Sequence, residues 1–275
     1  MALHPILKEQ LSKVRKLEYS DRVEYRITLS GSSFEEKGYV FTEEALFMLK
    51  ELFQGCPGVT RLHIQGYEFT EEVFGKMLAF LKTTTLPDLE LLEFQKGRFT
   101  VKMGQAVADY LLDNHYIKKF ELSHSRVTDQ VMEPIVKAFQ RGITLKKVSF
   151  YDNSYTEKTS RAIFATLAFN TTLKDLEMDT HFSFCGFCED PWIEGILKYN
   201  YTLRRGNLSS ETDCPCGYWN SGRFVLPRKS HHEVTKIKKE VQDISLLKRC
   251  ALIAKFNQLD SSVIPKVTRV AYDLD

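Results

Sequence analysis

The sequence predicts an α/β solenoid in which a strand, a turn and a helix recur along most of the chain. Apolar triplets of the form L-x-x-L-x-L start at Val59, Leu89, Ile117, Leu145 and Leu173, so successive starts lie 30, 28, 28 and 28 residues apart. Ten and eleven residues after each of the first four starts stand an apolar residue and a threonine. One such unit cannot bury its own apolar face, so the units are expected to stack side by side.

Each triplet predicts a strand whose apolar side chains point into the core. A degraded sixth copy runs from Leu203 to Leu208, with Gly206 at the middle apolar position, and the segment 23–29 predicts a first strand. The five regular triplets are Val59/Leu62/Ile64, Leu89/Leu92/Phe94, Ile117/Phe120/Leu122, Leu145/Val148/Phe150 and Leu173/Leu176/Met178.

The threonine that follows each triplet predicts the start of a helix. Its hydroxyl can accept a hydrogen bond from a free backbone N–H, and the apolar residue before it can pack on the first turn. Thr42 repeats the pattern ahead of a helix predicted near residues 46–53, and polar turns such as Asp113-Asn-His end the helices. The four regular pairs are Phe69-Thr70, Phe99-Thr100, Val127-Thr128 and Tyr155-Thr156.

This pattern resembles the ribonuclease-inhibitor type of leucine-rich repeat, the long-helix class also found in tropomodulin-like proteins. The segment from Phe169 to Met178 (FNTTLKDLEM) is close to that family's junction between helix and strand, and the resemblance covers roughly residues 20–210. It implies parallel strands on a concave face and helices on a convex face. The chain departs from the family by its frequent Phe, Val and Met in leucine positions, and by the missing capping threonine after Leu173.

The repeats predict a division of the chain into two parts. The solenoid is expected over residues 1–222 and a helical C-terminal cap or module over 223–275, because the periodicity changes there to helical spacing. The repeats are expected near residues 23–58, 59–88, 89–116, 117–144, 145–172, 173–202 and 203–222.

Side chains between the triplet positions are expected on the concave face, where they form three rows across the strands. A basic row beside an acidic one could bind a protein partner of mixed charge, although such residues could also only solvate the sheet and pair with each other. The surface as a whole favours a non-catalytic scaffold for protein–protein interaction, with His63 and Tyr151 as its expected anchors. The candidate contact residues are Arg61, His63, Glu93, Lys119, Glu121, Lys147, Tyr151, Asp175, Glu177 and Arg205.

Two cysteine pairs could hold one structural zinc ion. Cys185 and Cys188 form a C-x-x-C motif, and Cys214 and Cys216 form a C-x-C motif, both in equivalent loops of adjacent units. Four thiolates bind Zn²⁺ tetrahedrally, and neighbouring strands lie about 4.8 Å apart, so the two loops could share one ion. Free thiols are an equally good interpretation, and a redox pair is a weaker one because a thioredoxin-like context is missing.

A second function is suggested by residues 245–254 (SLLKRCALIA), which resemble the elongin-binding box of cullin-type ubiquitin-ligase receptors. The resemblance implies that Leu246 and Cys250 contact elongin B/C and that the chain is a substrate receptor for a cullin. A helix that merely caps the solenoid would show the same Leu/Cys stripe. A third possibility, binding to actin filament ends as in tropomodulin, rests on the resemblance in fold alone.

Charge and composition speak against other classes. A formal net charge of +2 without a basic stripe gives no reason to expect a nucleic acid, and no apolar run is long enough for a membrane span. The first ten residues lack the apolar core of a secretory signal, so a cytoplasmic location is expected. Phosphate-binding glycine loops and His-Glu-x-x-His patterns are also missing, so we expect no enzyme.

Overall fold

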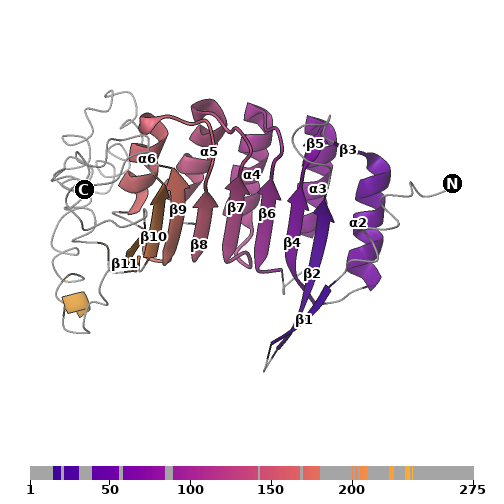
Figure 1. Cartoon of the computed structure of the whole chain (residues 1–275), viewed down its shortest axis with the longest axis horizontal. Coiled ribbons are helices and arrows are strands. Elements are labelled where there is room, and N and C mark those ends of the chain that lie inside the picture. Colours follow the sequence, from indigo (N-terminus) through magenta and orange to yellow (C-terminus); the bar gives the residue numbers. More distant parts are fainter. Residues whose placement is uncertain are drawn as a thin grey trace, which may run out of the picture.

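The computed structural model of the chain consists of one long sheet with helices along one of its faces (Figure 1). It describes residues 15–19, 22–30, 39–55, 58–83, 89–141, 143–167, 170–179, 200, 202–203, 205–209, 223–225, 233–235 and 237.

Strands and helices alternate through the regular repeats. The helices are α2 (Glu43–Gly55), α3 (Glu71–Thr83), α4 (Val101–Asp113), α5 (Asp129–Gln140) and α6 (Glu157–Leu167). The strands are β1 (Arg15–Tyr19), β2 (Arg22–Ser30), β3 (Tyr39–Phe41), β4 (Val59–Gln65), β5 (Tyr67–Phe69), β6 (Leu91–Gln95), β7 (Lys119–Ser123), β8 (Lys147–Phe150), β9 (Asp175–Asp179), β10 (Arg205–Ser209) and β11 (Arg223–Val225).

Within the described residues, the main sheet has nine strands in the order β1-β2-β4-β6-β7-β8-β9-β10-β11. All pairs from β2 to β10 are parallel, and each end of the sheet adds one antiparallel strand, β1 beside β2 and β11 beside β10. Consecutive strands are therefore neighbours, as expected for a solenoid in which each unit contacts only the next. The predicted α/β leucine-rich-repeat solenoid is confirmed, and β11 extends its sheet past residue 222.

The core lies between the sheet and the helices, and the predicted triplet residues form its sheet side. Leu62, Leu92, Phe120, Val148 and Leu176 occupy the middle triplet position of successive repeats, and each is at most 1% exposed. They are aligned in register across the parallel strands. The 28-residue spacing therefore becomes a continuous apolar layer, because equivalent residues of adjacent units pack against one another.

Most of the predicted threonine caps are present. The hydroxyls of Thr42, Thr70 and Thr100 accept hydrogen bonds from the backbone N–H three residues later, at 3.4, 3.2 and 3.3 Å, and that of Thr156 from Lys158 at 3.3 Å. Thr128 stands at the predicted N-cap position of α5, but its side chain does not make the predicted capping hydrogen bond. At this helix start only the backbone carbonyl of Thr128 closes the first turn. It accepts hydrogen bonds from the N–H groups of Val131 and Met132 at 3.1 and 3.0 Å.

Asparagines close the turns between helix and strand. The side-chain oxygens of Asn114, Asn170 and Asn200 accept hydrogen bonds from the backbone N–H groups two and three residues later, at 2.7–3.2 Å. The Asn200 amide group also donates to the carbonyl of Leu167 in the preceding repeat, at 2.6 Å. Each asparagine thus fixes the point at which the next strand begins.

A second, two-stranded parallel sheet joins the first two repeats, and the sequence pattern does not predict it. It pairs β3 with β5, directly before the caps of α2 and α3. Phe41 stacks on Phe69 with ring centroids 4.8 Å apart and meets Tyr67 edge-on at 5.6 Å. Aromatic residues at the apolar position before two successive caps thus bring their backbones into pairing distance.

Acidic residues at two helix starts link neighbouring repeats. Glu71 of α3 accepts a hydrogen bond from the Thr100 hydroxyl at 2.8 Å. Asp129 of α5 accepts three bonds from the start of α6: from the N–H and the hydroxyl of Thr156, at 2.8 and 2.7 Å, and from the hydroxyl of Thr159, at 2.6 Å. Burial raises the pKa of Asp129, but these hydrogen bonds outweigh it and lower the pKa below its ordinary value of 3.8.

Replacing Asp129 with asparagine is expected to lower the free energy of unfolding by about 1 kcal/mol at neutral pH. Because folding lowers the pKa of this carboxyl, its contribution is complete above pH 3.8 and is lost as the pH falls through the lower value of the folded chain. The difference between the two proteins should therefore shrink when urea unfolding is repeated at about pH 3. Asp109→Asn, on the exposed side of α4, is the control, and a difference that does not depend on pH would contradict the assignment.

The α4 and α5 helices approach each other closely at Gly104. A Cβ atom at Gly104 would lie 2.3 Å from the carbonyl oxygen of Val131 and 3.1 Å from its Cγ1 atom. A glycine is therefore required at this point of α4. By contrast, a Cβ atom at Gly75 of α3 would meet no atom within 4 Å.

Candidate protein-binding surface

The helices that the structure describes all lie on one face of the sheet (Figure 1), and we call the opposite face the concave face. The strand registers confirm the predicted rows on it. The first row joins Arg61, Leu91, Lys119, Lys147, Asp175 and Arg205, and the second row joins His63, Glu93, Glu121, Ser149, Glu177 and Asn207. Of the third row, the pairings Gln65–Gln95–Ser123 and Asp179–Ser209 are present.

The second row holds its acidic side chains close to the sheet. His63 and Glu93 are buried, at 7% and 8% exposed, and His63 Nε2 lies 3.5 Å from Glu93 Oε1. Glu121 is half-buried on the next strand. At the predicted anchor position His63, the structure thus places a ring that packs against its neighbour rather than an exposed aromatic group.

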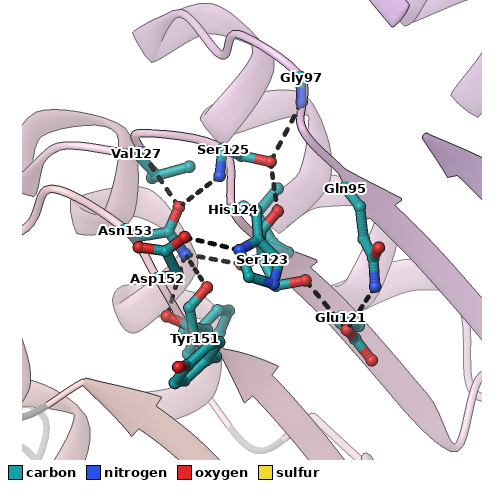
Figure 2. A network of polar contacts seen from close by, with 12 residues as sticks. Gln95, Gly97, Glu121, Ser123, His124, Ser125, Val127, Tyr151, Asp152 and Asn153 are labelled. Atoms are coloured by element: carbon teal, nitrogen blue, oxygen red, sulfur yellow. Dashed lines mark hydrogen bonds and ion pairs between the residues drawn. The ribbon is translucent and has the colours of Figure 1, made fainter. Parts of the chain in front are cut away.

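A side-chain amide separates the two central carboxylates. Gln95 Nε2 donates to Glu93 Oε1 at 2.5 Å and to Glu121 Oε1 at 2.9 Å, and the Ser123 hydroxyl donates to the same oxygen of Glu121 at 2.9 Å (Figure 2). Like charges on adjacent strands repel each other, so this network stabilises an arrangement that would otherwise be unfavourable. The Glu121 carboxylate is consequently held in one orientation on the open surface.

Basic residues dominate the first row. Lys147 Nζ forms an ion pair with Glu177 Oε1 at 3.0 Å, whereas Lys119 forms no ion pair with any residue that the structure describes. Lys119 and Lys147 stand directly opposite each other on β7 and β8. The predicted basic row therefore exists, and it is balanced only in part by carboxylates.

Tyr151 follows β8 and is 39% exposed, as an aromatic anchor should be. Its ring meets that of His124 edge-on, with centroids 5.4 Å apart, and His124 Nδ1 lies 2.6 Å from Asp152 Oδ2 (Figure 2). Lys96, His124 and Asp152 occupy equivalent positions of successive repeats, and all have a positive φ of 52–56°. This backbone conformation turns the chain away from the end of each strand.

A buried polar network fixes the turn that carries Tyr151. Asn153 Oδ1 accepts from the N–H groups of Ser125 and Val127 at 3.2 and 3.1 Å, and its Nδ2 donates to the carbonyls of Leu122 and Phe150 at 2.8 and 2.9 Å (Figure 2). The Ser125 hydroxyl extends this network to the N–H of Gly97 at 3.3 Å and to the carbonyl of Ser123 at 2.7 Å.

The residue pattern of the sequence does not single out His124, Asp152 or Asn153 as surface residues of interest. The available signal was the 28-residue register, which aligns His124 with Asp152 in the residue that follows the third concave row.

Several predicted site residues lie outside the part of the chain that the structure describes. They are the side chain of Arg205, the cysteines 185, 188, 214 and 216, and the adaptor-contact residues Leu246 and Cys250. Within the described part, no group of three or more His, Cys, Asp or Glu residues could hold a metal ion. The same part contains no helix that is long and apolar enough to cross a membrane.

The zinc site stays a prediction, and metal analysis tests it. If the four cysteines hold zinc, protein purified without chelator should contain about one equivalent per chain, and replacing Cys185 and Cys188 with serine should remove it; free thiols, the equally good interpretation, predict no bound zinc. Less than about half an equivalent in the unmodified protein would leave free thiols as the better interpretation.

Comparisons with known proteins concern the fold. No family model matches the chain, and no curated protein matches it. The chain is similar to the solved structure of leiomodin-1 actin-binding site 2, with 24% identity, a TM-score of 0.43 and coverage of 64% of this chain and 94% of that one. It is also similar to the tropomodulin C-terminal domain from Caenorhabditis elegans, with 13% identity, a TM-score of 0.41 and coverage of 66% and 98%. By its own repeat register, parallel sheet and one-sided helices, the chain is a leucine-rich-repeat solenoid.

Proposed function

We propose that the chain is a non-catalytic scaffold that binds a partner protein through its concave face. The observation that carries the proposal is the oriented network around Gln95 and Glu121, with the exposed ring of Tyr151 beyond it on the next repeat. Side chains that are already held in place lose less entropy when a partner binds, and an exposed aromatic ring is the kind of group that dominates binding energy.

A pair of matched variants tests this proposal. The concave variant replaces Gln95, Glu121 and Tyr151 with alanine, and the control replaces Gln105, Glu133 and Phe47, which are exposed side chains on the helices. Each variant removes one amide, one carboxylate and one aromatic ring. Both should remain folded, because every replaced side chain is at least partly exposed.

Affinity capture with the unmodified chain identifies a partner, and calorimetry with that purified partner gives its dissociation constant. We expect the concave variant to bind about 10-fold more weakly or worse and the control to stay within about 2-fold. Equal binding by the concave variant, or a loss confined to the helix variant, would place the binding surface elsewhere.

We also propose, as a second function, a substrate receptor of a cullin-type ubiquitin ligase, on the resemblance of residues 245–254 alone. Pull-down with purified elongin B/C should retain the unmodified chain and lose the Leu246→Ala variant. If the unmodified chain is not retained, this function is excluded.

A further inference from the structure

Lysines gather along one edge of the sheet, where strands β7, β8 and β9 begin. They are Lys118, Lys119, Lys146, Lys147 and Lys174, and we call them the lysine edge. In Figure 1 this is the lower edge, where the strand arrows start. Backbone hydrogen bonds place the lysines side by side, since Lys146 N–H donates to the Lys118 carbonyl at 2.7 Å and Lys174 N–H to the Lys146 carbonyl at 2.8 Å.

Only part of this positive charge is balanced. Lys118 pairs with Glu90, and Lys147 pairs with Glu177. Lys119, Lys146 and Lys174 form no ion pair with any other residue in the described ranges, and each is half-buried or exposed. Like charges that face each other across two strands destabilise a sheet, as Lys119 and Lys147 do here. An unfavourable cluster of this kind points to a ligand that relieves it.

The opposite edge of the sheet shows that the excess is local. Its turns contain Lys96 and Arg126 but also Asp129 and Asp152, and Arg98 beside them lies 3.4 Å from Glu68. Positive and negative residues therefore balance there. The whole chain carries a formal charge of only +2, so the lysine edge is a concentrated positive region on a nearly neutral protein.

An exposed aromatic ring borders the lysines. Tyr116 is 60% exposed in the turn before β7. Its N–H donates to Asn114 Oδ1 at 2.9 Å, so the turn that presents it is held in place. A rigid turn can offer such a ring to a partner with little loss of entropy.

We propose that the lysine edge binds an acidic peptide segment of the partner protein, a proposal that rests on the scaffold function proposed above. Three adjacent strands span about 10 Å, which an extended peptide covers with about three to four residues. Closely spaced Asp and Glu side chains of such a segment would reach the free ammonium groups, and an apolar side chain beside them would cover Tyr116. The carboxylates of Glu90, Glu177 and Asp175 interrupt the positive charge near these lysines. The edge therefore suits a short acidic segment whose carboxylates can be spaced to match the lysines better than a nucleic acid with a charged phosphate at every nucleotide.

Fluorescence anisotropy with a fluorescein-labelled (Glu-Asp)₄ peptide and the full chain tests this inference. The edge variant replaces Lys119, Lys146 and Lys174 with alanine. The control variant replaces Lys102, Lys137 and Lys158, which lie on the helices α4, α5 and α6 and change the net charge equally. We expect the edge variant to bind about 10-fold more weakly, the control to change by less than about 2-fold, and the affinity of the unmodified chain to fall as salt is added.

Two further measurements complete the test. Replacing the same three lysines with arginine should preserve binding, since the charge is kept, and circular dichroism of each variant verifies that it is folded. The concave variant with Gln95, Glu121 and Tyr151 replaced should still bind the peptide, so failure of the scaffold function and failure of this inference are distinguishable. No binding of the peptide, or an equal loss in edge and control variants, would overturn the proposal. Tighter binding of a labelled eight-nucleotide single-stranded DNA with the same dependence on the lysines would overturn it in favour of a nucleic acid.

Discussion

Replacing Gly104 with alanine is expected to lower the free energy of unfolding by about 3 kcal/mol, although alanine is the better helix former. The new Cβ atom would lie 2.3 Å from the carbonyl oxygen of Val131, which belongs to the backbone of α5 and cannot rotate away. The two helices would have to separate, and the core between them would lose contact. Urea unfolding followed by circular dichroism measures the effect.

Gly75→Ala is the matched control for this prediction. It makes the same change on α3, where the new Cβ atom meets nothing within 4 Å. The intrinsic preference of alanine should therefore appear alone there and raise the free energy of unfolding by about 0.5–1 kcal/mol. Effects of the same sign at Gly75 and Gly104 would show that the close approach of α4 and α5 is not what requires glycine.

Replacing Asn153 with alanine should destabilise the chain by a similar amount, about 3 kcal/mol. The substitution removes the acceptor of the N–H groups of Ser125 and Val127 and the donor to the carbonyls of Leu122 and Phe150. The Phe150 carbonyl keeps a bond from the Tyr155 hydroxyl at 3.1 Å, but the N–H groups of the buried residues Ser125 and Val127 lose their acceptor. Buried backbone N–H groups without an acceptor cost far more than an average hydrogen bond contributes. Thermal and urea unfolding both measure the loss.

Two further substitutions distinguish the effect of the Asn153 hydrogen bonds from effects of other contacts in the same turn. Asn153→Asp keeps acceptors but places a carboxylate against two carbonyl oxygens, so it should destabilise the chain at pH 7. Protonation restores a donor, and the loss relative to the unmodified chain should therefore shrink as the pH falls toward about 5. Asp152→Asn changes only the exposed contact with His124 and should cost less than about 0.5 kcal/mol. If Asp152→Asn destabilised the chain as much as Asn153→Ala, the loss would come from any change in this turn and not from the Asn153 hydrogen bonds.

The sequence predicts this fold well because its information is periodic. Residues such as Leu92, Phe120 and Val148 recur at one spacing, so their strands, their register and the buried side of the sheet follow from the spacing alone. The rows on the concave face follow from the same register. The exposure of each side chain in a row is harder to predict from the sequence. The repeat pattern predicts which face of the sheet a side chain points to, but not how far its neighbours bury it.

His63 illustrates this limit. Its place in the second row is predicted correctly, yet its burial depends on the size and position of Glu93 on the next strand. Asn153 shows a second limit, since three of its four main partners lie in residues 122–127 of the preceding repeat, which only folding brings beside it. The lysine edge combines residues just before a strand with the first residues of strands, and the row pattern describes only the latter.

The hydrogen bonds between the starts of neighbouring helices bear on which repeats the array could lose and still keep its contacts. Glu71 and Asp129 accept hydrogen bonds from the next repeat, but the residue in the same position of the repeat between them is Val101, which cannot. Loss of the single unit 117–144 would bring Val101 against Thr156 and Thr159, whose hydroxyl groups would then lose their carboxylate acceptor. Loss of units 89–116 and 117–144 together would instead bring Glu71 to the same threonines and restore an acceptor. The repeats look alike in sequence, but the choice of which unit is lost decides whether a carboxylate or an apolar side chain meets the threonines of the next helix start.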